Sequence, residues 1–323
     1  MSRGRSRPNR RAASLPSGPR SARGDFASRG LVAAFMRWLD APQPVLRLEI
    51  IRICAPLAIL GFMSARLAHA DEWIGDSGFR VPDLGASDWR QPLYLPGLPP
   101  WAAWSVAAVL VVSGLMVAAG FRPRPAAGIF AAASAYVALS DRLATFTVSK
   151  LAPVVALALA LGPCGQRIGV DAWRAARRHP SRPLPSEISS GAVRFFQVLL
   201  PVVYSASGIA KLRGDWLDDG HVLWTHLHDS YQTPVSWWLA NTLPVAAWTV
   251  FQAATLAFEV LAPVWFALRW TRVPALVAGL TMHLLIGTMF GPVKYFAMLM
   301  ASMLLGAYLP EPLLDALASV ART

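Results

Sequence analysis

The sequence predicts an all-α protein, a polytopic transmembrane bundle of about eight helices. Hydrophobic residues make up 55% of the 323 residues and charged residues only 15%, with a mean hydropathy of +0.43. A soluble domain of this size cannot hide so much apolar surface in its interior. The other two observations that predict the fold are a series of apolar stretches and an uneven distribution of arginines.

The apolar stretches are spaced along nearly the whole chain, and several approach the ~20 residues that a helix needs to cross a bilayer. The third and fourth are short and contain or adjoin Pro153 and Pro163, so we expect them to tilt, to extend into polar flanks or to form half-helices. The predicted spans are 47–68, 101–120, 125–141, 150–164, 192–212, 244–267, 273–290 and 294–309.

The arginines predict the orientation of this bundle. With the N-terminus inside, the cytoplasmic segments hold twenty arginines and the external segments four. Such an excess marks the cytoplasmic face of membrane proteins. We therefore expect a multi-pass protein of the cell membrane with both termini in the cytoplasm. The external segments 69–100 and 213–243 are acidic and aromatic instead.

The chain divides by composition into three parts. Residues 1–45 are predicted to be a basic, disordered cytoplasmic tail with an amphipathic lead-in, 46–310 the transmembrane domain, and 311–323 a short C-terminal tail. An organellar transit peptide has a similar composition to the first part, but we favour a tail attracted to anionic lipid. The net charge of +12 does not indicate nucleic acid binding, because the basic residues do not alternate with aromatic ones.

Ionisable residues within the predicted spans need a physical reason, because each costs at least ~2.5–3.5 kcal/mol at the bilayer centre. Arg52 either pairs with Glu49 near the interface or has a buried partner elsewhere. Glu259 lies in the middle of a span, so it needs a cation, a proton or a hydrated cavity. His283 is also at mid-span, as a hydrogen-bonded structural residue or as part of a polar site with Glu259.

Lys211 ends the fifth predicted span, at the external mouth of the bundle. One interpretation is an interfacial anchor, with the ammonium among headgroups beside Asp215 of the external motif Asp215–Trp216. The other is a lysine in a dry cavity, where desolvation favours the neutral amine that can act as a general base. We expect no metal site, because the spacing of the three external histidines is not that of a zinc site and no cysteine lies beside them.

The segment YSASGIAKLRGDWLDDG, residues 204–220, resembles a signature of the HTTM (horizontally transferred transmembrane domain) family. That family is related to the membrane domain of the vitamin K-dependent γ-carboxylase. Weaker matches follow in the right order across roughly residues 46–310: RLEIIRI, GFRPRPAAGIF, LAFEVLAPVWF and MHLLIGTMFGPVKYFAMLM.

The resemblance implies that Lys211 corresponds to the carboxylase base that deprotonates vitamin K hydroquinone. It also makes Arg52 the nearest candidate for the cation of Glu259, if that carboxyl group is paired and not protonated. Val148 stands where the carboxylase has its catalytic histidine, and valine cannot move a proton. We also expect the chain to lack the large lumenal region that engages protein substrates. We therefore do not expect glutamate carboxylation.

Two functions remain open, and the sequence does not decide whether the protein is an enzyme. The first is a membrane enzyme acting on a lipid-soluble, quinone-like substrate, with Lys211 as the base and Arg52, Glu259 and His283 as polar support. The second is a non-catalytic accessory protein for the maturation or export of a secreted peptide. The predicted partners are the lipid bilayer and one of these two ligands, and no cofactor is indicated beyond a quinone-like molecule.

Overall fold

The computed structural model describes residues 22–78, 93–140, 146–218, 220–228 and 231–320. Two compact units are separated after Ala41. The first contains the helix α1, Ala22–Asp40, which covers most of the predicted amphipathic lead-in. The predicted disordered tail before it, residues 1–21, lies outside the described residues, as do Asp229 and much of the acidic segment 69–100.

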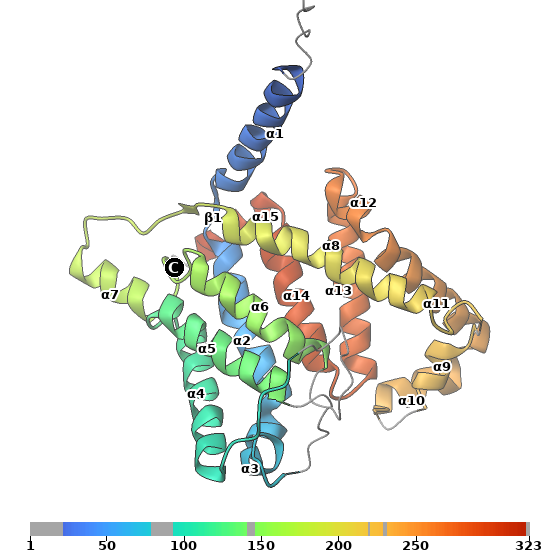
Figure 1. Ribbon diagram of the computed structural model, residues 1–323. Helices are drawn as coiled ribbons and strands as arrows, with labels where there is room; N and C mark the ends of the chain where they lie inside the picture. Colours follow the sequence, from blue (N-terminus) through green and yellow to red (C-terminus); the bar gives the residue numbers. More distant parts are fainter. Residues whose placement is uncertain (1–21, 79–92, 141–145, 219, 229–230, 321–323) are drawn as a thin grey trace, which may run out of the picture. The chain divides into compact units, whose positions relative to one another are not determined.

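The second unit is a helix bundle with one small strand pair (Figure 1). The strands are β1 (Gln43–Pro44) and β2 (Glu187–Ile188), which pair antiparallel. The helices are α2 (Leu46–Leu67), α3 (Ala70–Trp73), α4 (Pro100–Ala119), α5 (Pro123–Ser140), α6 (Thr147–Leu161), α7 (Val170–Arg178), α8 (Gly191–Leu212), α9 (Val222–His226), α10 (Pro234–Thr242), α11 (Val245–Val260), α12 (Ala262–Ala267), α13 (Arg272–Met289), α14 (Lys294–Tyr308) and α15 (Glu311–Val320).

The predicted all-α class is confirmed, and each predicted span corresponds to a helix. The sixth predicted span corresponds to two helices, because it is divided into α11 and α12 at Leu261. Pro263 follows at the start of α12, where its missing N–H is tolerated. The predicted C-terminal tail is largely the helix α15, which contacts α2.

When the helices are judged by their length and apolar composition, fewer of them qualify as membrane spans than the sequence predicts. Within the described ranges, α2, α4, α8 and α13 are each long and apolar enough to cross a membrane. Two bent pairs, α10 with α11 at 116° and α14 with α15 at 102°, would raise the number from four to six. The helix α6 is apolar but has only 15 residues. A count of eight spans therefore stays a prediction.

The ends of α4 and α10 follow ordinary capping chemistry. Helix α4 begins with Pro100, which has no N–H to leave unpaired, and ends at Gly120. Gly120 has a φ of 70°, the left-handed conformation that glycine adopts at low cost. Helix α10 starts with a reciprocal capping box between Thr233 and Ser236.

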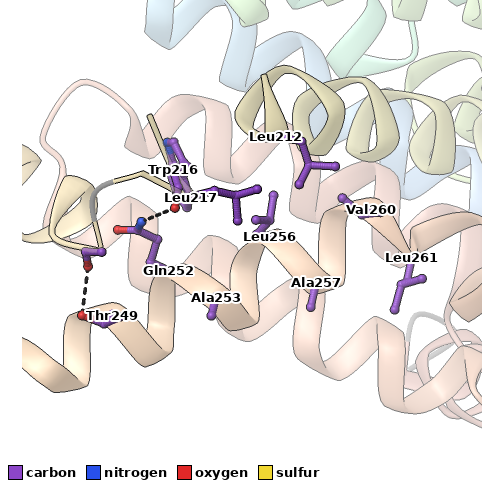
Figure 2. A pocket seen from close by; sticks show the side chains of 11 residues that line it. Leu212, Trp216, Leu217, Thr249, Gln252, Ala253, Leu256, Ala257, Val260 and Leu261 are labelled. Atoms are coloured by element: carbon purple, nitrogen blue, oxygen red, sulfur yellow. Dashed lines mark hydrogen bonds between the residues drawn. The ribbon is translucent and has the colours of Figure 1, made fainter. Parts of the chain in front are cut away.

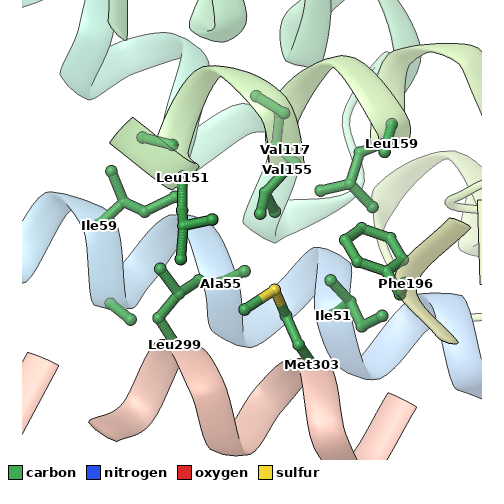
Figure 3. Close-up of a cluster of buried hydrophobic side chains, with 14 of the residues drawn as sticks. Ile51, Ala55, Ile59, Val117, Leu151, Val155, Leu159, Phe196, Leu299 and Met303 are labelled. Carbon is green, nitrogen blue, oxygen red and sulfur yellow. The ribbon is translucent and has the colours of Figure 1, made fainter. Parts of the chain in front are cut away.

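The main apolar core is centred on α2, which contacts α4, α6 and α14. Figure 3 shows side chains of α2 between those of α6 on one side and α14 on the other. The labelled members of this core are Ile51, Ala55, Ile59, Val117, Leu151, Val155, Leu159, Phe196, Leu299 and Met303. A second contact region joins α8 to α11, α12 and α14, and it carries the candidate site.

Candidate functional site

Lys211 and Glu259 form an ion pair between the last turn of α8 and α11. The Nζ atom of Lys211 lies 2.5 Å from both carboxylate oxygens of Glu259 and donates to the Oγ of Ser207 at 3.2 Å. The two charged side chains are 21% and 8% exposed. Glu259 is thus paired with a cation, as expected. The prediction that this cation is Arg52 is wrong, because the partner is Lys211.

The aromatic ring of Trp216 lies beside this pair, with its centroid 4.8 Å from the Nζ of Lys211. The side chain of Gln252 fixes the loop that carries Trp216: its Nε2 donates to the Trp216 carbonyl at 2.8 Å, and its Oε1 accepts the Leu223 N–H at 3.1 Å. Asp215 is exposed, and no ion pair joins it to Lys211 in the described part of the chain. The ammonium of Lys211 therefore pairs with Glu259 and not with Asp215.

Gly208 brings α8 and α11 close enough for the pair to form. A Cβ atom at position 208 would lie 2.9 Å from the backbone nitrogen of Val260 and 3.2 Å from the carbonyl carbon of Glu259. Glycine therefore allows direct contact between the two backbones. Gly208 lies one helical turn before Lys211, so the close contact and the ion pair share one face of α8.

His283 forms a second polar contact in the same region. Its Nε2 lies 2.8 Å from the hydroxyl of Tyr204, on the face of α8 that also carries Lys211. His283 and Tyr204 are both about 2% exposed, and the Nδ1 of His283 is buried without a hydrogen-bond partner among the described residues. Lys211 is close enough to act electrostatically on His283, and Glu259 on Tyr204. The two contacts thus form one polar region across α8, α11 and α13.

Sequence reasoning missed Tyr204 and Gln252. Tyr204 precedes Lys211 by seven residues, two helical turns, and so it lies on the same face of α8. Gln252 precedes Glu259 by the same interval on α11. The seven-residue spacing was one available signal in the sequence. The other was that a glutamine inside an apolar span needs hydrogen-bond partners.

An apolar groove of about 460 Å³ lies next to the ion pair. Figure 2 shows Leu212, Trp216 and Leu217 on one side of the groove and side chains of α11 on the other. From α11 the groove is lined by Thr249, Gln252, Ala253, Leu256, Ala257 and Val260. Leu212 directly follows Lys211 and Val260 directly follows Glu259, so the wall of the groove adjoins both charged residues.

A family profile described as the HTTM domain matches residues 87–308, which is more than half of the chain. The chain belongs to the HTTM family. No curated protein and no solved structure matches it. The matched range of the HTTM domain includes Lys211, Glu259 and His283, whereas Arg52 lies before it.

Arg52 lies outside the region of Lys211 and belongs to a separate ion pair. Its Nε donates to Glu49 at 2.6 Å, its Nη1 to the carbonyls of Val117 and Ala118 at 2.6 and 2.8 Å, and its Nη2 to the carbonyl of Ile168 at 2.8 Å. Both charged side chains are fully buried. The expected pairing with Glu49 is present, but the arginine does not reach toward headgroups.

Val148 occupies the first turn of α6 and is fully buried in the main core of the HTTM bundle. It lines neither the groove nor the polar region. No group of three metal-ligating side chains occurs within the described residues. Lys211 and Glu259 are side chains of the kind that exchange protons and stabilise charge, and they lie next to an apolar surface.

Proposed function

We propose that this HTTM protein is a membrane enzyme that takes a proton from a lipid-soluble, quinone-like substrate, with Lys211 as the general base and Glu259 as its partner. The observation that carries the proposal is the position of the Lys211–Glu259 pair directly beside the groove of α11. Two ionisable side chains at the edge of an apolar groove are the arrangement expected of a site for an amphipathic ligand.

The pair suits the removal of a proton from a phenol-type hydroxyl. One acidic proton is shared between the amine and the carboxylate, which lie 2.5 Å apart. When the O–H bond of the substrate breaks, its proton moves to the pair. Lys211 and Glu259 together then carry two acidic protons. The ammonium of Lys211 is left facing the substrate oxyanion and stabilises it in a region of low dielectric constant.

The groove fits the apolar remainder of such a substrate. Ala253, Leu256, Ala257 and Val260 give it an aliphatic wall on α11, and the Trp216 ring, which also lines the groove, lies 4.8 Å from the Nζ of Lys211. A ring system stacked near Trp216 would bring its hydroxyl to Lys211, while an isoprenoid or acyl tail would follow Leu256 and Val260. His283 and Tyr204 would support the site from α13 and α8.

We also propose that the protein is a multi-pass protein of the cell membrane with both termini in the cytoplasm. The excess of arginine in the alternate segments supports this orientation. It would put the Lys211 end of α8 at the external side and the Arg52 region at the cytoplasmic side.

Two neighbouring alanines of α11 provide the test. Ala253 lines the groove beside Trp216, while Ala254 lines a different hollow on α11 with Phe258 and Trp265. We expect solvent extracts of the purified protein to contain a quinone that mass spectrometry detects. Ala253→Trp should remove it and Ala254→Trp should retain it. Equal retention in both variants, or no quinone in any of them, would contradict a substrate in this groove.

One observation favours the alternative, an accessory protein for a secreted peptide. Val148 is buried among apolar side chains at the position where the resemblance has a catalytic histidine. An accessory protein would keep its effect on the maturation or export of the peptide when Lys211 is replaced by Met. An enzyme would lose its effect in that variant while its folding stays intact.

A further inference from the structure

Three arginines of the bundle gather at the end opposite to Lys211. Arg47 lies in the first turn of α2, Arg194 in the first turn of α8, and Arg272 is the first residue of α13. Arg47 is only 6% exposed, although it is a charged side chain. This arginine cluster is separate from the proposed catalytic region and does not depend on it.

A chain of hydrogen bonds connects the first two arginines. The Nη1 of Arg47 donates to the carbonyl of Ala307 at 3.2 Å, and the Nε2 of Gln197 donates to the same carbonyl at 2.8 Å. The Nη1 of Arg194 in turn donates to the Oε1 of Gln197 at 2.8 Å. Arg47 and Arg194 are therefore held on either side of one peptide group near the C-terminal end of α14.

Arg272 joins the same layer through Phe266 and Tyr308. Its Nε donates to the carbonyl of Phe266 at 3.1 Å. The ring of Phe266 stacks on that of Tyr308 with a centroid distance of 4.4 Å, and the Tyr308 hydroxyl donates to the carbonyl of Gln197 at 2.5 Å. The same glutamine thus connects all three arginines.

Positive charge is concentrated in this layer. Arg47 is repelled by both Arg194 and Arg272, and in the described part of the chain the carboxylate that attracts it is that of Glu311. The acceptors of Arg47 and Arg272 are neutral carbonyls, and the Nε of Arg47 is buried with no partner in the described ranges. Three guanidinium groups that lie close together, one of them with a buried Nε that has no partner in the described residues, favour the binding of an anion.

We infer that this arginine cluster binds the phosphate of an anionic phospholipid headgroup. Guanidinium groups match phosphate oxygens in geometry and charge. The arginine count predicts that this end of the bundle faces the cytoplasmic leaflet, where anionic lipids concentrate. Beside the cluster, Val264, Leu268 and Trp270 expose 49%, 39% and 72% of their surface. These side chains provide apolar contacts for the acyl chains and an indole for the interface.

The thermal stability of the full-length protein in detergent tests the inference. A lipid that binds the folded state raises the melting temperature, and the rise grows with the logarithm of the lipid concentration relative to its Kd. We expect phosphatidylglycerol to raise it by about 5 °C and phosphatidylcholine to leave it unchanged. The double variant Arg194→Gln, Arg272→Gln should lose most of that shift. The partly exposed Arg194 and Arg272 are chosen because replacing the buried Arg47 could unfold the protein.

The matched control removes two charges elsewhere on the same predicted face. Arg178 and Arg182 are exposed in and after α7, so Arg178→Gln, Arg182→Gln should keep the full shift. Equal losses in the two double variants would mean that general surface charge attracts the lipid, and would overturn the site. An equal shift with inorganic phosphate would overturn the lipid as its ligand, and no shift with phosphatidylglycerol would overturn the inference entirely.

Discussion

Two ion pairs of this HTTM protein, Arg52–Glu49 and Lys211–Glu259, differ in what surrounds them. Arg52 and Glu49 are both fully buried and one helical turn apart on α2. Arg52 also donates to the carbonyls of Val117, Ala118 and Ile168, and Glu49 accepts the backbone N–H of Arg167. The protein itself therefore surrounds this pair and supplies its hydrogen-bond partners.

The pair of Lys211 and Glu259 connects two helices and is partly exposed, with the apolar groove beside it. The charge of its lysine is shared with one carboxylate, one hydroxyl and the face of an indole ring. The comparison teaches that charge at membrane depth is not by itself a sign of function. The pair with an accessible apolar groove is the candidate for chemistry, and the enclosed pair is structural.

The largest expected effect concerns the proposed orientation, in which the two ion pairs would lie at opposite sides of the membrane. Reporter fusions should place both termini and residues 165–191 in the cytoplasm, and residues 69–100 and 213–243 outside. The arginine distribution is the physical reason. An external signal from residues 165–191 would put the Ile168 carbonyl, and with it Arg52, at the external side and would contradict the proposed orientation.

Arg52→Leu should be the most destabilising of the substitutions. It leaves the Glu49 carboxylate and three carbonyls buried without their donor, and losing one partner of a buried pair costs about 3–5 kcal/mol. Thermal unfolding in detergent measures the loss. A loss below that of Glu259→Ala would mean that water reaches Glu49, and the contrast between an enclosed and an accessible pair would fail.

Glu259→Ala should cost about 1.5–3 kcal/mol, because it removes a charge-assisted hydrogen bond from a partly exposed ammonium. Asp218→Ala is the matched control, since Asp218 is an exposed carboxylate in the loop after α8, and it should stay within about 0.5 kcal/mol of the wild type. Unfolding midpoints in the same detergent compare the two. Equal effects would show that Glu259 is hydrated and does not need Lys211.

Gly208→Ala should cost about 1–3 kcal/mol, because the added methyl group would overlap Val260 and push α8 away from α11. Gly128→Ala in α5 is the control, since a Cβ there meets nothing within 4 Å, and alanine favours the helix by roughly 0.5–1 kcal/mol. Opposite signs in the two variants are the expected result. A neutral Gly208→Ala would show that the close approach of the helices is not needed.

Much of this fold could be predicted from the sequence because lipid imposes local rules. Long apolar runs predict the helices, and the loop arginines predict how they alternate. The break at Leu261 was harder to foresee from Pro263, because proline also occurs inside continuous membrane helices. The number of spans depends on bends, such as the one between α10 and α11, that composition does not reveal.

The partner of Glu259 could not be predicted, because 48 residues and a loop separate it from Lys211. Charge alone favoured neither Lys211 nor Arg52, since both are cations near the ends of predicted spans. What decides between them is the close contact at Gly208 and the distribution of carbonyl acceptors around Arg52. Tyr204 was missed for the same reason, since its role depends on a hydrogen bond with a helix that follows much later in the chain.

The reactivity of the three lysines tests the central claim, that the Lys211–Glu259 pair is accessible from the apolar groove. Lys150 and Lys294 are exposed, so an amine-selective reagent should label them quickly, and Lys211 more slowly because Glu259 holds it. A hydrophobic quinone analogue should slow the labelling of Lys211 alone, and Ala253→Trp should abolish this protection while Ala254→Trp keeps it. Labelling of Lys211 at the rate of Lys150 and Lys294, unaffected by the analogue, would contradict the claim.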